Sequence, residues 1–321
     1  MTGAAPATLS IAETTALTRR ITWLSVGVAS VLTVVKALAW LASDSVAMLA
    51  SLADSGLDLV AALTTFFAVR YAVAPPDREH RYGHGKAEAF ASLMQAGLVF
   101  ASAALVGREA FDHLLRPTAV AQQGWGLVVM GVSILLTVAL VSAQSRVLNQ
   151  AKSVAVTGDR LHYLADLGSN IVALLAIGVS GLLHRPEPDA IGGLFVAAWL
   201  LWGAVGVFRA SSLELMDHEL PDEARARIVA LMTEDRRLSD VHQLRTRASG
   251  PFVHIQMHAD IDPSLSLIQA HEVMVAAEKR VLDAFPAADI IIHPDPRGRA
   301  EPHGGAFGEV YDQPEAESAT G

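Results

Sequence analysis

Six apolar stretches, each long enough to cross a membrane, follow one another along the chain as far as residue 208. About 20 consecutive, mostly apolar residues span the hydrocarbon core of a bilayer as a helix. The six stretches cover residues 21–42, 46–69, 87–115, 125–141, 154–183 and 190–208. Polar residues interrupt the second and the fifth stretch and lower their hydropathy. The pattern predicts a six-helix α-helical transmembrane bundle.

The pattern changes after residue 209, where charged residues become frequent. Pro221 suits the first turn of a helix because it has no N–H, and the acidic residues behind it favour the positive end of the helix. Residues 252–261 alternate between apolar and polar side chains, which is the period of a strand. Further elements are expected as strands at 241–248 and 289–293 and as a helix at 265–285. The order αββαβ predicts a small α+β, ferredoxin-like domain with its helices on one face of the sheet.

Composition supports this division. The 321 residues are 52% hydrophobic, with a mean hydropathy of +0.37, which is more apolar than a soluble chain. There is no cysteine, so only His, Asp and Glu remain as strong metal ligands. The net charge of -9 belongs mainly to the polar region and does not favour a nucleic-acid partner. We predict a mobile tail at 1–18, a transmembrane domain at 19–210, a polar domain at 211–296 and a disordered tail at 297–321.

Basic residues in the short connections indicate the orientation in the bilayer. They gather before the first stretch and in the connections from second to third and from fourth to fifth: Arg19, Arg20, Arg70, Arg78, Arg81, Lys86, Arg146, Lys152 and Arg160. The connections on the other side carry chiefly Arg116 and Arg185. Because lysine and arginine mark the cytoplasmic side, both termini and the polar domain are expected in the cytoplasm of a multi-pass protein of the inner (plasma) membrane.

Two pairs of ionisable residues lie within the apolar stretches. Asp54 and Asp58 share the second stretch, and His162 and Asp166 share the fifth. Each pair is spaced i, i+4, so both members lie on the same side of a helix. One imidazole and three carboxylates suit a four-coordinate zinc ion between two helices. The alternative is that each pair makes a polar contact between helices or lines a wet cavity. Ser55, Ser169 and Asn170 are candidates for orienting the ligands.

A second cluster lies in the connection between the second and third stretches. Asp77, His80 and His84 place three metal-ligating side chains within eight residues. They predict a loop metal site, while the alternative is a charged loop near lipid headgroups.

The polar domain carries a third and more dispersed set: His242, His258, His271, His293 and Asp295. His242 and His258 lie on adjacent expected strands, and His293 and Asp295 close the last strand. A shared metal site is one interpretation, and solvated surface histidines are the other.

Taken together, these segments resemble the cation diffusion facilitators, in particular the bacterial branch that exports zinc and ferrous iron. The similarity covers about residues 15 to 297 and is carried by Leu52-Ala53-Asp54-Ser55-Gly56-Leu57-Asp58, Tyr82-Gly83-His84-Gly85-Lys86-Ala87-Glu88, His162-Tyr163-Leu164-Ala165-Asp166, Val241-His242-Gln243-Leu244-Arg245-Thr246-Arg247 with Ser249-Gly250-Pro251, Gln269-Ala270-His271 and Ile291-Ile292-His293-Pro294-Asp295-Pro296.

The resemblance implies roles for each cluster. The ligands of the two membrane pairs match the transport site, and the loop cluster matches a loop metal site. The dispersed set matches a binuclear site in which Asp295 bridges two ions. Lys86 and Asp217 match a salt bridge between the subunits of a homodimer. Pro294 departs from the family, in which a ligating or hydrogen-bonding side chain occurs at this position.

The ligand chemistry indicates how such a protein would work. A metal needs neutral imidazole and ionised carboxylates, so protons compete with it. We therefore expect zinc efflux by metal/proton antiport with alternating access, with cadmium, ferrous iron or manganese as other cargoes and no organic cofactor. A membrane metal sensor and a passive cation channel are the alternatives. A metallohydrolase is disfavoured because there is no H-E-x-x-H motif and no candidate base, so no enzyme is expected.

Overall fold

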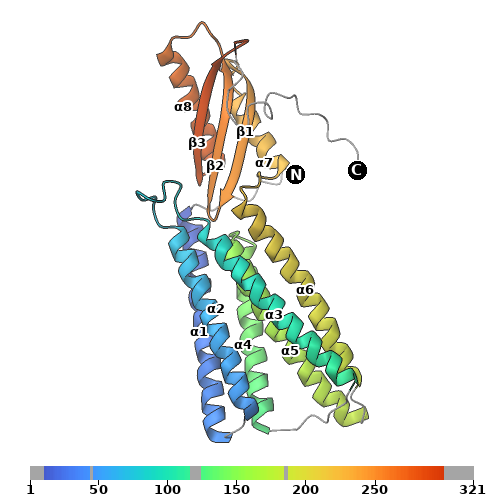
Figure 1. Cartoon of the computed structure of the whole chain (residues 1–321). Helices are drawn as coiled ribbons and strands as arrows, with labels where there is room; N and C mark the ends of the chain where they lie inside the picture. The colour runs from blue at the N-terminus through green and yellow to red at the C-terminus, as the bar shows by residue number, and fades with distance from the viewer. Residues whose placement is uncertain (1–10, 44–45, 116–123, 184–186, 300–321) are drawn as a thin grey trace, which may run out of the picture. The chain divides into compact units, whose positions relative to one another are not determined.

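The computed structural model describes residues 11–43, 46–115, 124–183 and 187–299. Arg116, Arg185 and most of both predicted tails (1–10 and 300–321) lie outside these ranges. The described chain divides into two compact units, 11–216 with Ser249–Pro251 and 217–248 with 252–299 (Figure 1). The first unit is helical, and the second combines helices with a sheet.

Six long helices are described in the first unit: α1 (Ile11–Ser43), α2 (Val46–Ala72), α3 (Ala87–Leu115), α4 (Gly124–Leu148), α5 (Val154–Leu183) and α6 (Glu187–Leu215). Several extend beyond the predicted apolar stretches, because hydropathy marks only the part suited to lipid. The tail predicted for 1–18 is helical from Ile11 onward, which corrects that prediction for these residues. Glu13 in the first turn stabilises this end of α1 through the helix dipole.

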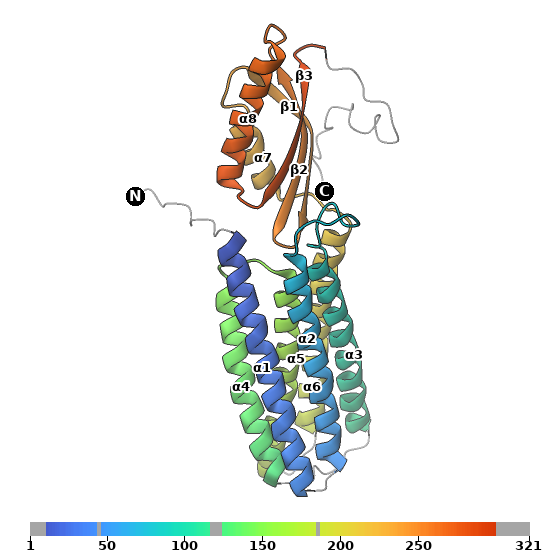
Figure 2. The same cartoon turned by 90° about the vertical axis from the view of Figure 1, so that its left-hand side faces the viewer.

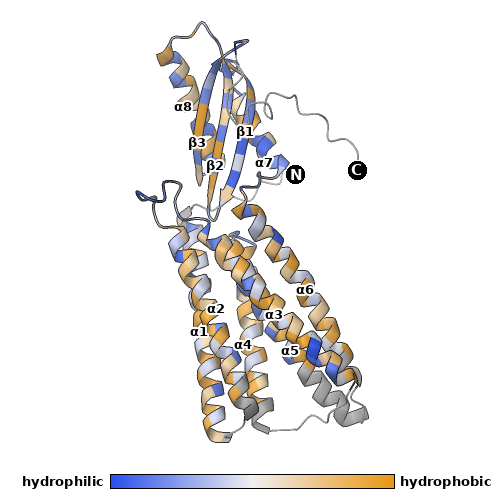
Figure 3. Ribbon diagram, in the orientation of Figure 1, coloured by the Kyte–Doolittle hydropathy of each residue, from blue (hydrophilic) through white to orange (hydrophobic). Residues whose placement is uncertain are grey.

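Five helices of the described chain, α1, α2, α3, α4 and α6, are long and apolar enough to cross a membrane. Figure 3 colours the ribbon by hydropathy and shows that hydrophobic residues predominate along these helices. Helix α5 is not among the five, and its first half carries Asp159, Arg160 and Asp166. It packs against α2, α3, α4 and α6, so protein surrounds much of it. The result is a helical transmembrane domain in which α5, with these charged residues, lies among the other helices.

The second unit has the expected order of elements: α7 (Asp222–Met232), β1 (Leu238–Ser249), β2 (Phe252–Ile261), α8 (Leu267–Ala284) and β3 (Ala288–Pro296). Pro221 precedes α7, and Ser266 with Gln269 forms a capping box that begins α8. The sheet order is β1-β2-β3. Strands β2 and β3 pair in parallel, and α8 connects them along the chain. The prediction of a small α+β domain is confirmed.

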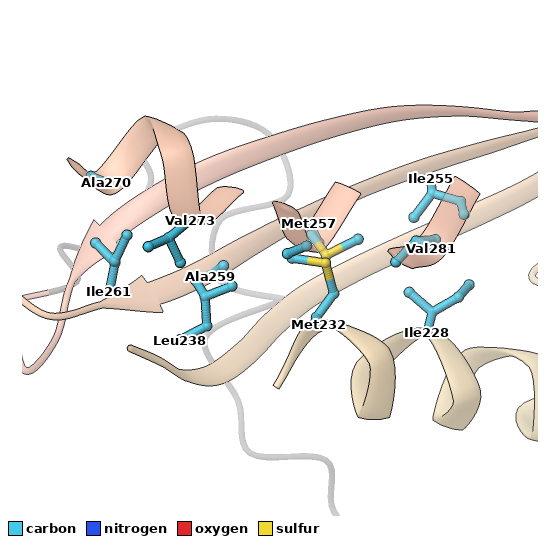
Figure 4. Packing of buried hydrophobic residues seen from close by; sticks show 11 residues of the cluster. Ile228, Met232, Leu238, Ile255, Met257, Ala259, Ile261, Ala270, Val273 and Val281 are labelled. Atoms are coloured by element: carbon cyan, nitrogen blue, oxygen red, sulfur yellow. The ribbon is translucent and has the colours of Figure 1, made fainter. Parts of the chain in front are cut away.

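Both helices cover one face of this sheet (Figure 2). Ile228 and Met232 of α7 and Val273 and Val281 of α8 pack on Met257 and its apolar neighbours (Figure 4). Side chains alternate along a strand, so His254, Gln256, His258 and Asp260 of β2 project from the other face. We call this surface, free of helices among the described residues, the open face.

Candidate metal centres

Helices α2 and α5 bring three ionisable side chains together in the transmembrane unit. His162 Nε2 lies 3.0 Å from Asp58 Oδ1 and 4.0 Å from Asp166 Oδ2. One ligand atom from each of the three residues lies within 4.8 Å of the others. Asp58 and His162 are buried, with 8% and 6% of their surface exposed. A divalent cation fits such a set, since two carboxylates balance its charge and the imidazole adds a neutral ligand.

Asp54 stands apart from this group of three. It lies one helical turn before Asp58 and is exposed in the single chain. Of the four predicted ligands, the structure therefore brings together three. Ser55 is buried, and its hydroxyl has no hydrogen-bond partner in the described part of the chain. Ser169 and Asn170 are partly exposed on α5.

The loop between α2 and α3 brings Asp77, His80 and His84 together, again with ligand atoms within 4.8 Å of one another. Asp77 accepts the backbone N–H groups of His80 at 2.6 Å and Glu79 at 2.9 Å. These hydrogen bonds, led by that from His80, lower the pKa of Asp77 to about 2. The carboxylate is therefore ionised and already oriented at physiological pH.

His84 is the buried member of the loop cluster, with 4% of its side chain exposed. Its ring packs 4.3 Å from that of Tyr71, and its Nδ1 faces the Ala74 carbonyl at 3.4 Å. Its Nε2 lies 3.3 Å from Asp77 Oδ2. Gly83 supplies the positive φ of 80° that turns the chain just before it. The loop thus presents Nε2 of His84 beside a carboxylate.

The open face of the sheet carries the third cluster, which surrounds Asp295. His242 Nε2 and His258 Nδ1 approach Asp295 Oδ2 at 3.3 and 2.9 Å, while His293 Nε2 approaches Oδ1 at 3.5 Å. The parallel register pairs His258 with His293 and Asp260 with Asp295. Asp295 uses both oxygens, which is the arrangement a carboxylate needs to bridge two ions.

Pro294 does not interrupt this cluster. It pairs in register with Ala259, and β3 is an edge strand of the described sheet. Proline is tolerated on an edge strand because the missing N–H faces no further strand. The strand therefore continues to Asp295, although the side chain at position 294 offers no ligand.

His271 is not brought to this cluster within one chain. It lies exposed on α8, which covers the other face of the sheet. The sequence reasoning missed Asp260, whose Oδ1 lies 3.9 Å from His242 Nδ1. The signal was present, because Asp260 follows His258 by two positions and so shares its side of the strand.

Lys86 and Asp217 belong to different units. Lys86 Nζ donates to the Leu215 carbonyl at 3.1 Å, and Asp217 forms an ion pair with Arg247 at 3.1 Å. Their salt bridge across two subunits stays a prediction.

Comparison with known proteins agrees with this architecture. Residues 22–216 match the cation efflux transmembrane domain, and residues 220–297 match the cation efflux protein cytoplasmic domain. The cation-efflux pumps FieF of Shigella flexneri serotype 5b (strain 8401) and Escherichia coli (strain K12 / DH10B) are each 40% identical over 269 residues, which is 84% of this chain and 89% of theirs. A solved structure of CzrB in its Zn form is 32% identical, covering 27% of this chain and 99% of its own, with a TM-score of 0.25.

The two domain matches and the relatives, not the CzrB structure, decide the assignment. The chain is a multi-pass membrane protein whose C-terminal domain is cytoplasmic, and it is a transporter and not an enzyme. It belongs to the cation diffusion facilitator family, whose member FieF it resembles, and it exports divalent cations.

Proposed function

We propose that this protein exports zinc across the inner (plasma) membrane by metal/proton antiport, as a homodimer with six spans and one transport site in each chain. The single observation that carries the proposal is the convergence of Asp58, His162 and Asp166 from two helices. Two acidic oxygens and one imidazole suit zinc better than harder cations, which prefer oxygen alone. Cadmium, ferrous iron and manganese are competing cargoes.

Proton coupling follows from what these ligands require. A metal binds when His162 is neutral and the carboxylates are ionised, so protons must leave as zinc enters. In the absence of metal, carboxylates held this close repel one another and favour protonation. If the site opens alternately to each side of the membrane, a proton gradient drives zinc outward. We expect Asp54, one turn away on α2, to complete a four-ligand shell when the helix or its side chain moves.

The two cytoplasmic clusters supply regulation in this proposal. The loop cluster binds one ion and the open face binds two, bridged by Asp295. His271 lies on the wrong face to reach that site in its own chain, so it is a ligand for a second copy in the homodimer. Metal binding between subunits would tighten the dimer when cytoplasmic zinc rises.

Transport by purified protein in vesicles tests the proposal. With a pH gradient imposed, we expect zinc uptake to rise with the gradient and to fall to background in Asp58→Ala. Asp112→Asn is the matched control, because this carboxylate is exposed on α3 and pairs with Arg108. Zinc uptake that ignores both the gradient and the Asp58 substitution would contradict the antiport.

A channel or a metal sensor is the competing function, and turnover separates the three. A channel needs weak, multiple binding sites and conducts far faster than a carrier. The tight cluster between α2 and α5 favours a carrier. A slow transport rate that saturates as the zinc concentration rises supports the carrier. Conduction at channel rates, or no flux at all, contradicts it.

A further inference from the structure

A further buried carboxylate, that of Asp159, lies near the transport site but is not one of its proposed ligands. Asp159 begins the polar half of α5 and is 1% exposed. It lies three residues before His162, so the two side chains occupy neighbouring positions on one side of the helix. Neither the transport site nor the cytoplasmic clusters account for a carboxylate at this depth.

Asp159 is the centre of a hydrogen-bonded network that joins five helices. Gln95 of α3 donates to Asp159 Oδ1 at 3.4 Å, and Gln144 of α4 donates to Oδ2 at 2.8 Å. The same Nε2 of Gln95 also reaches the Thr65 hydroxyl of α2 at 3.1 Å, and that of Gln144 reaches the Ser25 hydroxyl of α1 at 3.2 Å. All four partners are 1% exposed or less.

The network has fewer hydrogen-bond donors than acceptors among the described residues. Gln95 Oε1 and Gln144 Oε1 are buried acceptors without a hydrogen-bond donor in the described part of the chain. The donors that reach Asp159 there are the neutral groups of Gln95, Gln144 and Ser25. A carboxylate without a cation among its donors is costly inside a membrane domain, and so are the two vacant carboxamide oxygens.

One proton on Asp159 removes the charge and can satisfy one of the two vacant oxygens. It neutralises the carboxylate and turns one of its oxygens into an O–H donor. Rotation of a glutamine carboxamide then presents an Oε1 atom to accept this hydrogen. When the proton leaves, the carboxamide rotates back and its N–H again faces the carboxylate. The network therefore accommodates both protonation states.

Asp159 interacts electrostatically with charged and titratable residues in and around the transport site. From its own helix these are His162 and Tyr163, and His162 in turn interacts with Asp166 and with Asp58 of α2. On α3 Glu88 bonds to Ser153, and Arg160 of α5 donates to the Ser145 hydroxyl of α4 at 3.2 Å. The contribution of α1 is the neutral Ser25. A change of charge at Asp159 thus acts through space on the metal ligands.

We infer that Asp159 is a proton-carrying residue of the transport cycle, distinct from the metal ligands, held in the membrane domain by Gln95 and Gln144. The inference rests on the antiport proposed above. Asp159 takes up a proton as the metal leaves on the outer side and gives it up toward the cytoplasm before the next zinc binds. No bond to the metal is required of it.

The test counts protons per zinc in vesicles that contain a pH-sensitive dye, with Asp159→Asn beside the wild type. Asparagine keeps the shape and a carbonyl acceptor but holds no exchangeable charge. We expect zinc transport to continue with about one proton fewer per zinc and a shallower dependence on pH. The same stoichiometry and pH profile in Asp159→Asn would overturn the inference, with Asp112→Asn as the control.

If Asp159→Asn does not fold, Gln144→Met decides. Removing the 2.8 Å N–H donor leaves the carboxylate less stabilised, so the pH profile of transport must move to higher pH. An unmoved profile would overturn the inference, because a purely structural role predicts only a lower rate. The wild type separates this question from the proposed function: no response to the gradient there refutes antiport, whereas a wild-type response retained in both variants refutes only the role of Asp159.

Discussion

The metal centres of the membrane helices and of the sheet are built from opposite proportions of the same residues. In the membrane domain His162 lies between two carboxylates, both within 4.0 Å of its Nε2. On the open face Asp295 lies among three imidazoles, and the second carboxylate, Asp260, approaches only His242 among them, at 3.9 Å. The first set balances a divalent ion, which a low-dielectric environment demands. The second leaves excess positive charge, which water tolerates.

This difference also separates release from retention. Adjacent carboxylates favour protonation whenever the metal is absent, so the proposed antiport would exchange metal for protons at the membrane site. Imidazoles exposed to water cost little free energy when no metal is bound, and they bind zinc strongly near neutral pH. In the proposed function, the same ion is therefore cargo in one region and a regulatory ligand in the other.

The largest effect is expected at the membrane site. Asp58→Ala removes one of the two balancing charges beside His162, so zinc transport should fall by at least about 100-fold. Radioactive or fluorescent zinc uptake in vesicles measures it. Asp112→Asn should retain the wild-type rate, and equal rates in Asp58→Ala and the wild type would remove Asp58 from the site.

Selectivity should change more modestly than rate. His162→Asp makes the site all oxygen, which suits harder cations such as manganese. We expect the preference for zinc over manganese to fall by about tenfold, equivalent to roughly 1.4 kcal/mol. Competition between the two ions for uptake gives the ratio directly, and an unchanged ratio would show that His162 does not contact the cargo.

On the open face, loss of the shared carboxylate should affect binding more than transport. Asp295→Asn removes the negative charge that two imidazoles face at Oδ2 and one faces at Oδ1. The zinc affinity of the cytoplasmic domain should therefore drop about 10- to 100-fold. Calorimetry on the full-length dimer measures this. Transport should continue at a reduced rate. Abolished transport with intact cytoplasmic binding would reverse the assignment of the two sites.

The smallest effect is expected in the loop, where pH provides the test. The pKa of Asp77 is lowered from 3.8 to about 2, so its hydrogen bonds to Glu79 and His80 order the loop above about pH 4 and are lost as the pH falls toward 2. Loop zinc should leave at a higher pH than this, because protons compete with the metal for its ligands. Histidine NMR signals report both steps, and coincident loss of zinc and loop order near pH 2 would contradict the assignment.

The sequence predicted the helices and strands well because each depends on local periodicity. It predicted the beginnings of α2, α3 and α5 at the observed residues, since polar connections end sharply there. It did not predict the length of α1, because helical hydrogen bonds continue outside the apolar stretch. Asp260 was missed although its spacing puts it on the same side of β2 as His258, because its approach to His242 and its register with Asp295 depend on pairing between strands.

The sites were predictable where spacing alone decides. His162 and Asp166, or Asp77 and His80, are neighbours on a single element. Whether Asp54 or His271 joins its partners depends on packing between elements and between chains, which spacing does not encode. Asp159 is also noticeable in the sequence, because it is an acidic residue in the apolar stretch that forms α5. Its inferred role, however, depends on Gln95 and Gln144 from two other helices.

Zinc X-ray absorption spectroscopy tests whether the transported ion binds His162 and the carboxylates beside it. The protein would be purified in nanodiscs with His84→Ala and Asp295→Ala, so that the membrane site is the remaining strong one. We expect one zinc per chain with a single imidazole and oxygen ligands at about 2.0 Å, and loss of the imidazole signal in His162→Ala. A zinc ion without an imidazole ligand, or a spectrum indifferent to His162→Ala, would contradict this expectation.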